Sequence, residues 1–161
     1  MNLSEIFSDK IESFIKAANK HALNMILVGG GAVNFHGYQR HSADLDFWID
    51  ISEDNLQKLL LVLNDLGYQI KDLPEKVVQG EQNISIKISP VFDLELITKF
   101  NPGKTFTEAL NNCNTVSKDG ISYNVLSFED LISSKITSER IKDKMDIAEL
   151  QRIRLSKKRE N

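Results

Sequence analysis

The stretch VGGGAVNFHGYQRHSADLDFWI, residues 28–49, decides the fold that the sequence predicts. It begins at the end of a short apolar run, Met25 to Val28, which is typical of a buried strand. Three glycines follow and predict a tight turn, and Ala32 to His36 then begins a short helix that Gly37 closes. The stretch ends inside a run of alternating residues, Asp44 to Ile51, which indicates a strand of period two. This order of elements predicts a mixed α/β domain.

Two acidic residues dominate the second strand of this stretch. Asp44 and Asp46 are separated by one residue, so their carboxylates point to the same face, with Cα atoms roughly 6–7 Å apart. Two like charges this close repel each other unless a cation lies between them. Carboxylate oxygens suit Mg²⁺, which proteins bind through carboxylates together with substrate phosphates. The alternative is an exposed strand face that carries two solvated acids.

A second acidic face follows later in the chain. Asp93 and Glu95 share one side of the predicted strand Val91 to Ile97, whose apolar residues face the core. If this strand lies beside the first acidic strand, three carboxylates come together, as a two-metal phosphoryl or nucleotidyl transfer requires. Three glycines alone are more often a tight turn than a phosphate site. Between a strand and a helix, however, they let backbone N–H groups approach phosphate oxygens.

The remaining chain predicts helices around this sheet. Asp9 to His21 has the apolar spacing of an amphipathic helix, and Ser52 caps a second helix that ends near Gly67. Hairpins are expected at Ser89-Pro90 and Asp119-Gly120, with a short helical piece at Thr107 to Leu110 between them.

A helical region ends the chain. Ser127 caps it, and it divides into two helices that share one apolar stripe. The stripe consists of Leu131, Ile132, Ile136, Ile141, Met145, Ile147 and Leu150. We therefore predict one domain over residues 1–161, with a core of about residues 22–125 and C-terminal helices over about 127–156. The fold class is α/β (α+β), a mixed sheet flanked by helices.

Composition and charge exclude several classes of protein. The 161 residues are 41% hydrophobic and 27% charged, which is typical of a soluble globular domain rather than a disordered chain. The single cysteine, Cys113, cannot form an intrachain disulfide. A net charge of −3 argues against generic nucleic-acid binding. Neither a signal peptide nor a membrane-spanning run is recognisable, so we expect a cytoplasmic location.

The central stretch resembles the nucleotidyltransferase superfamily. The signature of that superfamily is Gly-Gly or Gly-Ser, a helix, and then Asp-x-Asp or Asp-x-Glu. Within it, the chain is similar to small stand-alone bacterial proteins related to the AbiEii-type toxin nucleotidyltransferases, which implies a nucleotidyltransferase-like mixed sheet. The matching positions are Gly29, Gly30, Ala32, Arg40, Ser42, Asp44 and Asp46.

The resemblance implies roles for these residues. Divalent metal, Mg²⁺ or Mn²⁺, would be held by Asp44, Asp46 and a third carboxylate, which falls on Asp93, with Glu95 as the alternative. The same carboxylates would be catalytic. Asp93 is the preferred general base, which would take the proton from the hydroxyl group of the substrate that receives the nucleotide. The nucleotide triphosphate would be bound by Gly29, Gly30, Arg40, Ser42, Lys135 and Arg140. Gly30 offers only its backbone N–H where Gly-Ser members have a hydroxyl.

The C-terminal region resembles a helical motif of the same superfamily, onto which Lys135, Arg140, Asp143 and Asp146 map. Lys135 and Arg140 either clamp the triphosphate or lie on an ordinary solvated helix face. Asp146 either belongs to the site or pairs with a lysine one turn earlier. Arg40 likewise either contacts phosphate or pairs with Asp44.

The predicted function is metal-dependent transfer of a nucleoside monophosphate from an NTP to an unidentified acceptor. RNA, tRNA or a protein is favoured over an antibiotic, because resistance enzymes typically carry Gly-Gly-Trp before their acidic pair, where this chain has Gly29-Gly30-Gly31-Ala32. The alternative is a non-catalytic binding partner in a toxin–antitoxin or defence system, with a cognate antitoxin. The basic residues between Arg152 and Arg159 either guide an RNA acceptor or form a solvated helix end.

Overall fold

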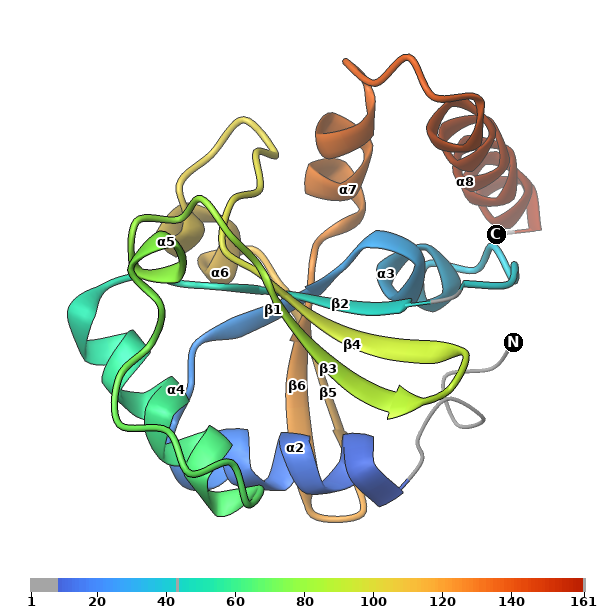
Figure 1. Cartoon of the computed structure of the whole chain (residues 1–161). Helices are drawn as coiled ribbons and strands as arrows, with labels where there is room; N and C mark the ends of the chain where they lie inside the picture. Colours follow the sequence, from blue (N-terminus) through green and yellow to red (C-terminus); the bar gives the residue numbers. More distant parts are fainter. Residues whose placement is uncertain (1–8, 43, 161) are drawn as a thin grey trace.

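A mixed sheet forms the centre of the protein (Figure 1). The computed structural model describes residues 9–42 and 44–160, and within them six strands pair in the order β3-β4-β2-β1-β6-β5. The predicted α/β class with a mixed sheet is confirmed. The strands are β1 (Met25–Val28), β2 (Asp44–Ile49), β3 (Ile84–Ser89), β4 (Phe92–Ile97), β5 (Asn114–Lys118) and β6 (Ile121–Val125).

Parallel and antiparallel pairs alternate across the sheet. β1 runs antiparallel to β2 and parallel to β6, while β2 runs parallel to β4. The outer pairs, β3–β4 and β5–β6, are the two predicted hairpins. In the second hairpin, Asp119 and Gly120 have φ values of 52° and 82°, the left-handed backbone that a two-residue turn of this kind requires.

Helices cover the sheet on both sides. α2 (Asp9–Lys20) and α4 (Glu53–Asp65) pack on one face, and α3, α7 and α8 lie on the other side (Figure 1). The predicted cap of α4 is present, because the Ser52 side chain accepts a hydrogen bond from the Asn55 N–H. The other helices are α3 (Gly29–Phe35), α5 (Glu75–Val78), α6 (Phe106–Asn111), α7 (Phe128–Lys135) and α8 (Ile141–Glu160).

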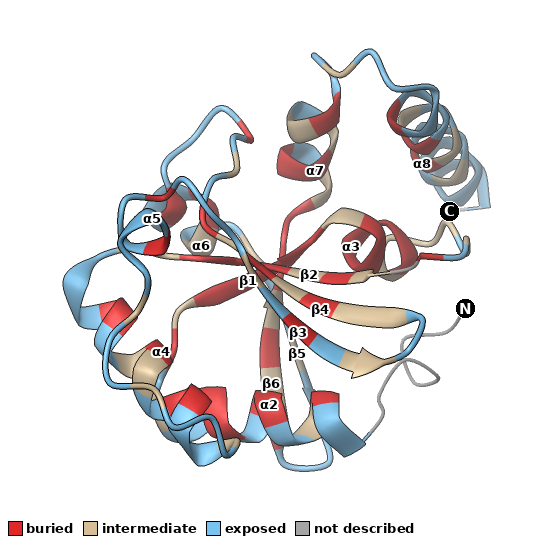
Figure 2. Cartoon of the chain, in the orientation of Figure 1, coloured by how far each residue is buried: buried red, intermediate tan, exposed pale blue. Residues whose placement is uncertain are grey.

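The core follows the alternation of β2. Leu45, Phe47 and Ile49 alternate with the acidic residues and are buried, and the Phe47 ring lies 6.0 Å from that of Phe14 in α2. All four residues of β1 are buried, as expected for a central strand (Figure 2). β2 therefore presents its apolar side chains to the core and its acidic residues, Asp44 and Asp46, to the other side of the sheet.

The predicted start of the first short helix was wrong. We expected a glycine turn before a helix at Ala32, but α3 already begins at Gly29, and the three glycines form its first turn. Gly29 has a φ of 59°, a left-handed conformation that glycine adopts without a steric penalty. The chain therefore passes from β1 into α3 without a connecting loop.

The predicted single apolar stripe of the C-terminal helices was also wrong. Ile136, Ile141 and Met145 were expected in the core, yet they are 67%, 75% and 53% exposed. On α8 the buried residues are instead Asp143, Asp146 and Leu150. The two carboxylates face the domain because they form ion pairs there, and this orientation turns part of the apolar stripe outward.

In the described part of the chain, none of the helices combines the length and the apolar character needed to cross a membrane.

Candidate active site

Four acidic residues share one face of the sheet on the neighbouring strands β2 and β4. The parallel register places Asp44 opposite Asp93 and Asp46 opposite Glu95. Residues opposite each other in a sheet point to the same face, so all four side chains lie on the side away from α2 and α4. The structure thus brings the two predicted acidic faces together, while their role as metal ligands stays a prediction.

Gly29 lies directly beside Asp46, and Gly30 lies beside Ser42. Val28, the last residue of β1, pairs with Asp46 across the sheet. A Cβ added to Gly29 would lie 2.5 Å from Oδ2 of Asp46, and one added to Gly30 would lie 2.5 Å from Oγ of Ser42. Neither neighbour leaves room for a side chain. The glycines therefore allow the backbone to approach the acidic strand closely, as a phosphate site beside a metal would require.

The electrostatics of the site centre on Asp46. Burial raises the pKa of Asp46 to about 6, and repulsion from Asp44 and Glu95 adds to this effect. The positive charges of Lys142 and Lys135 act in the opposite direction. A carboxylate held among other carboxylates in a half-buried place is a group whose charge a bound cation would stabilise.

The donor set fits Mg²⁺ in one particular way. Among residues 9–42 and 44–160, no group of three or more His, Cys, Asp or Glu side chains is arranged to hold one ion. Mg²⁺ is commonly bound by one or two carboxylates, with water and substrate phosphates completing its coordination. Asp44 and Asp46 beside Gly29 match this arrangement, and a metal here would depend on the triphosphate for further ligands.

Arg40 connects the site to the last helix. Its Nε and Nη2 atoms donate to the two carboxylate oxygens of Asp146, at 2.7 and 2.9 Å. Asp146 is fully buried, and this bidentate geometry is among the stronger kinds of ion pair. Arg40 therefore pairs with Asp146. The sequence had offered a pair between Arg40 and Asp44 as one of two interpretations, and the structure does not support it. A phosphate contact for Arg40 stays a prediction.

Lys135 lies in the same buried cluster. Its Nζ atom is 3.0 Å from Asp143 and 3.2 Å from Asp146, and only 8% of its side chain is exposed. Asp146 thus pairs with Arg40 and Lys135 rather than with Lys142, a lysine one turn earlier. Lys135 is neither on a solvated helix face nor a free cation.

Asp143 gathers the neighbouring cations. Burial would raise its pKa, but hydrogen bonds from Ser138, Lys135 and Arg140 hold that pKa well below its usual range. Arg140 donates from Nε to Asp143 over 2.8 Å, while its side chain stays 74% exposed. The structure therefore places Arg140 at the rim of the cluster and Lys135 inside it.

Sequence reasoning missed the role of Asn34 in the glycine turn at the start of α3. Asn34 is buried, and its Nδ2 atom donates to the carbonyl oxygens of Gly30 and Arg40, at 2.8 and 3.1 Å. Its Oδ1 atom accepts from the Arg40 N–H. Asn34 thereby ties the first turn of α3 to the segment that carries Arg40. The signal in the sequence was a polar residue within a short apolar helix, four positions after Gly30.

Sequence reasoning considered Lys142 only as a possible ion-pair partner of Asp146. Its charge acts on Asp46, and it forms no ion pair with any residue that the structure describes. The pattern that mattered was its place beside Asp143, one turn before Asp146.

The aromatic and histidine residues near the site have packing roles. Trp48 is only 6% exposed, and its ring lies 5.1 and 4.9 Å from the rings of Phe100 and Phe106. His36 forms a 2.7 Å hydrogen bond with the carbonyl oxygen of Leu126, and burial lowers its pKa. These contacts give both residues a packing role.

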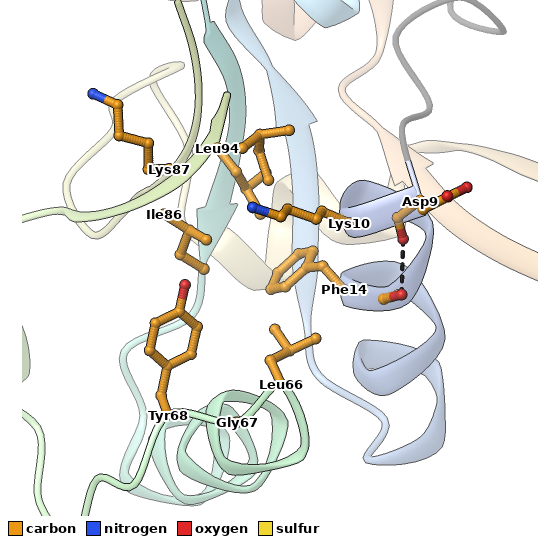
Figure 3. Close-up of a pocket in the computed structure, with 11 residues that line it drawn as sticks. Asp9, Lys10, Phe14, Leu66, Gly67, Tyr68, Ile86, Lys87 and Leu94 are labelled. Atoms are coloured by element: carbon orange, nitrogen blue, oxygen red, sulfur yellow. Dashed lines mark hydrogen bonds between the residues drawn. The ribbon is translucent and has the colours of Figure 1, made fainter. Parts of the chain in front are cut away.

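A separate cavity lies on the opposite face of the sheet (Figure 3). Its volume is about 480 Å³, and its walls come from α2, the end of α4 and the β3–β4 hairpin. Leu94, which points away from the acidic face, and Phe14 of α2 line it. The cavity is therefore not part of the acidic site.

The raised pKa of Asp46 predicts a pH-dependent stability. The folded protein holds this proton more tightly than the unfolded chain, so stability is lost as the pH rises from about 4 through about 6. Asp46→Asn cannot ionise, and we expect it to be more stable than the wild type at pH 8 by about 2–3 kcal/mol. Near pH 4 the two proteins should be equally stable. Urea unfolding in EDTA at both pH values measures the difference.

A matched control for this experiment is Asp54→Asn, which removes a carboxylate that is 82% exposed on the surface of α4. This variant should differ from the wild type by the same small amount at both pH values. Superimposable unfolding curves of Asp46→Asn and wild type at pH 8 would contradict the raised pKa.

Comparison with known proteins places the chain in a family. The sequence model of the family described as nucleotidyltransferases of unknown function (DUF6036) matches residues 2–155. No curated protein matches the chain. Because the family model covers nearly the whole chain, the chain belongs to this nucleotidyltransferase family.

Proposed function

We propose that this member of the nucleotidyltransferase family is an enzyme that transfers a nucleoside monophosphate from an NTP to a hydroxyl acceptor. The observation that carries the proposal is the register of Asp44 and Asp46 with Asp93 and Glu95, beside the closely approaching backbone of Gly29. Among acceptors, RNA, tRNA or a protein is favoured. The narrower similarity to AbiEii-type toxins, and a cognate antitoxin as partner, stay predictions.

The carboxylates define the reaction centre. Asp44 and Asp46, with Asp93 or Glu95, would hold Mg²⁺ or Mn²⁺, which when bound polarises the α-phosphate and offsets charge on the leaving pyrophosphate. The acceptor oxygen attacks the α-phosphorus, and the bond from that phosphorus to the bridging oxygen of the β-phosphate breaks. A carboxylate, Asp93 by preference, accepts the proton of the acceptor hydroxyl.

Other residues would hold the triphosphate. Gly29 and Gly30 bring backbone N–H groups close to the acids, with Ser42 packed against Gly30. Lys135 shares its charge with two carboxylates, so we assign the more direct phosphate contacts to Arg140 and Lys142. Arg140 forms an ion pair with Asp143, and Lys142 precedes Asp143 in the sequence. The positive charge of Lys142 acts on Asp46.

A transfer assay tests this function. The protein is incubated with each α-³²P-labelled NTP, Mg²⁺ or Mn²⁺, and either total RNA or a protein lysate, and label on each fraction is measured. Metal-dependent label on one fraction identifies both the reaction and the class of acceptor. NTP binding without any transfer, or neither, would favour the alternative of a non-catalytic binding partner in a toxin–antitoxin or defence system.

Gly29→Ala should weaken nucleotide binding. The new Cβ would collide with the Asp46 carboxylate, and the residue would also have to adopt a φ of 59°. We expect at least tenfold weaker binding of labelled NTP in the presence of Mg²⁺, measured by filter binding. Gly103→Ala is the control, because Gly103 has a φ of 82° but no heavy atom within 4 Å of an added Cβ. Equal losses in the two variants would mean that backbone strain, not the approach to Asp46, is responsible.

A further inference from the structure

α8 carries two chemically different faces. Its domain side contains the buried residues Asp143, Asp146 and Leu150. Figure 2 shows that the buried part of α8 is turned toward α7. Successive residues of a helix are separated by about 100°, so Met145 lies about 200° from Asp143, on the far side. We define the outer face of α8 as Ile141, Met145, Ala148 and Leu155, all of which are exposed.

The outer face has the spacing of a coiled-coil seam. Its residues follow one another at intervals of four, three and seven, and Arg152 occupies the position between Ala148 and Leu155. Apolar residues at this alternation of three and four are those that a second helix covers when two helices pack side by side. Ile141, Met145 and Leu155 are 75%, 53% and 58% exposed, so the seam is uncovered within the chain as described.

Cations border this seam. Lys144, Arg152, Lys158 and Arg159 lie along or beside it. Of these, Arg152 pairs with Glu149, whereas the other three form no ion pair with residues that the structure describes. A helix that covers the seam must therefore place its own flanking residues against an excess of positive charge.

We propose that the outer face of α8 docks an acidic amphipathic helix of a partner protein. Apolar residues of that helix would cover Ile141, Met145 and Leu155, and its Glu or Asp residues would meet the bordering cations. A second copy of this chain fits poorly, because two α8 helices would set cation against cation. Nucleic acid would use the cations but leave the apolar seam uncovered.

This inference does not rest on the proposed enzymatic function. The outer face points away from Asp143 and Asp146, whose side of α8 faces the carboxylate site. Docking is therefore tested by binding alone, with the full chain and without substrate.

The test uses two synthetic helical peptides as probes. Both are about 20 residues long and have Leu at the seam positions, and they differ only in carrying Glu or Lys at the flanking positions. We expect the Glu peptide to bind the full chain at least tenfold more tightly than the Lys peptide, measured by fluorescence anisotropy. This preference should weaken as the salt concentration rises.

The surface variant is Met145→Glu combined with Leu155→Glu. Both side chains are exposed, so the fold should persist, which the melting temperature checks. We expect this variant to bind the Glu peptide at least tenfold more weakly. The matched control, Leu61→Glu combined with Val78→Glu, changes two comparably exposed apolar residues outside α8 and should bind as the wild type does.

Three results would overturn the proposal. The first is binding of the Glu peptide that does not change in the α8 variant, or no binding of either peptide. The second is a dimer of the chain by light scattering that Met145→Glu dissociates, since a second copy would then cover the face. The third is displacement of the Glu peptide by a 20-nucleotide RNA whose own affinity is unaffected by the α8 substitutions.

Discussion

Asp44→Asn and Asp46→Asn should each lower nucleotidyl transfer by about a thousandfold or more. Each substitution keeps the shape of the side chain but removes the charge that would hold the metal against the triphosphate. Metal-ion stabilisation of developing charge contributes several kcal/mol to such reactions, and about 4 kcal/mol corresponds to a thousandfold change in rate. Initial rates of label transfer from the preferred NTP, at saturating Mg²⁺, measure the effect.

Stability and activity must be separated in this experiment. Asp46→Asn should fold at least as stably as the wild type at neutral pH, because it removes repulsion from Asp44 and Glu95. A loss of transfer therefore cannot be attributed to unfolding. Asp54→Asn, on the far surface, should transfer at the wild-type rate. Transfer that survives in both Asp44→Asn and Asp46→Asn would disprove the catalytic assignment.

The same assay decides the third carboxylate. The sequence favoured Asp93, and the register puts Asp93 opposite Asp44 but Glu95 opposite Asp46. Asp93→Asn and Glu95→Gln are therefore compared under identical conditions. The residue that completes the metal site should show a loss as large as that of Asp46→Asn, and the other only a modest one.

Local pattern was sufficient to predict the two acidic strands but not that they are neighbours. Period-two alternation around Asp44 and Asp93 identified two strands with acids on one face. Their parallel pairing, which brings the two acidic faces together, is a finding of the structure. The start of α3 was placed wrongly, since three glycines are usually interpreted as a turn and only the left-handed φ of Gly29 lets the helix begin there. α5 follows Pro74 and spans four residues, too few for a periodic pattern.

The basic part of the site could not be predicted in the same way. Arg40 and Asp146 are 106 residues apart, and neither neighbourhood indicates the other. The apolar stripe in α8 was assumed to face the core, because charged residues are seldom fully buried. Pairing of Asp143 and Asp146 with cations reverses that preference, and it turns Ile141 and Met145 toward solvent. A long-range ion pair thus set the orientation of a whole helix.

Asp146→Asn should destabilise the protein by about 3–5 kcal/mol. The carboxylate is fully buried, accepts hydrogen bonds from Arg40 and forms an ion pair with Lys135. The side chain of Arg40 is 12% exposed, and that of Lys135 is 8% exposed. Removing its charge leaves two largely buried cations without adequate compensation, and breaking a buried pair in this way costs several kcal/mol. For a domain of this size, the melting temperature should fall by roughly 10 °C. Differential scanning calorimetry and urea unfolding at pH 7 measure the loss.

The control for Asp146 lies one turn later on the same helix. Glu149→Gln removes the partner of Arg152, whose side chain is 66% exposed, and an ion pair in water contributes less than about 1 kcal/mol. Replacing Arg40, Lys135 and Asp146 together with apolar residues, as in Arg40→Met, Lys135→Met and Asp146→Leu, should restore much of the stability, since buried Asp143 keeps its hydrogen bonds from Ser138 and Arg140. This triple variant should nevertheless bind NTP poorly, because it removes Arg40 and Lys135, two of the cations that the resemblance assigns to the triphosphate. Equal stability of Asp146→Asn and Glu149→Gln would show instead that water reaches Arg40 and Lys135, and that Asp146 does not orient α8.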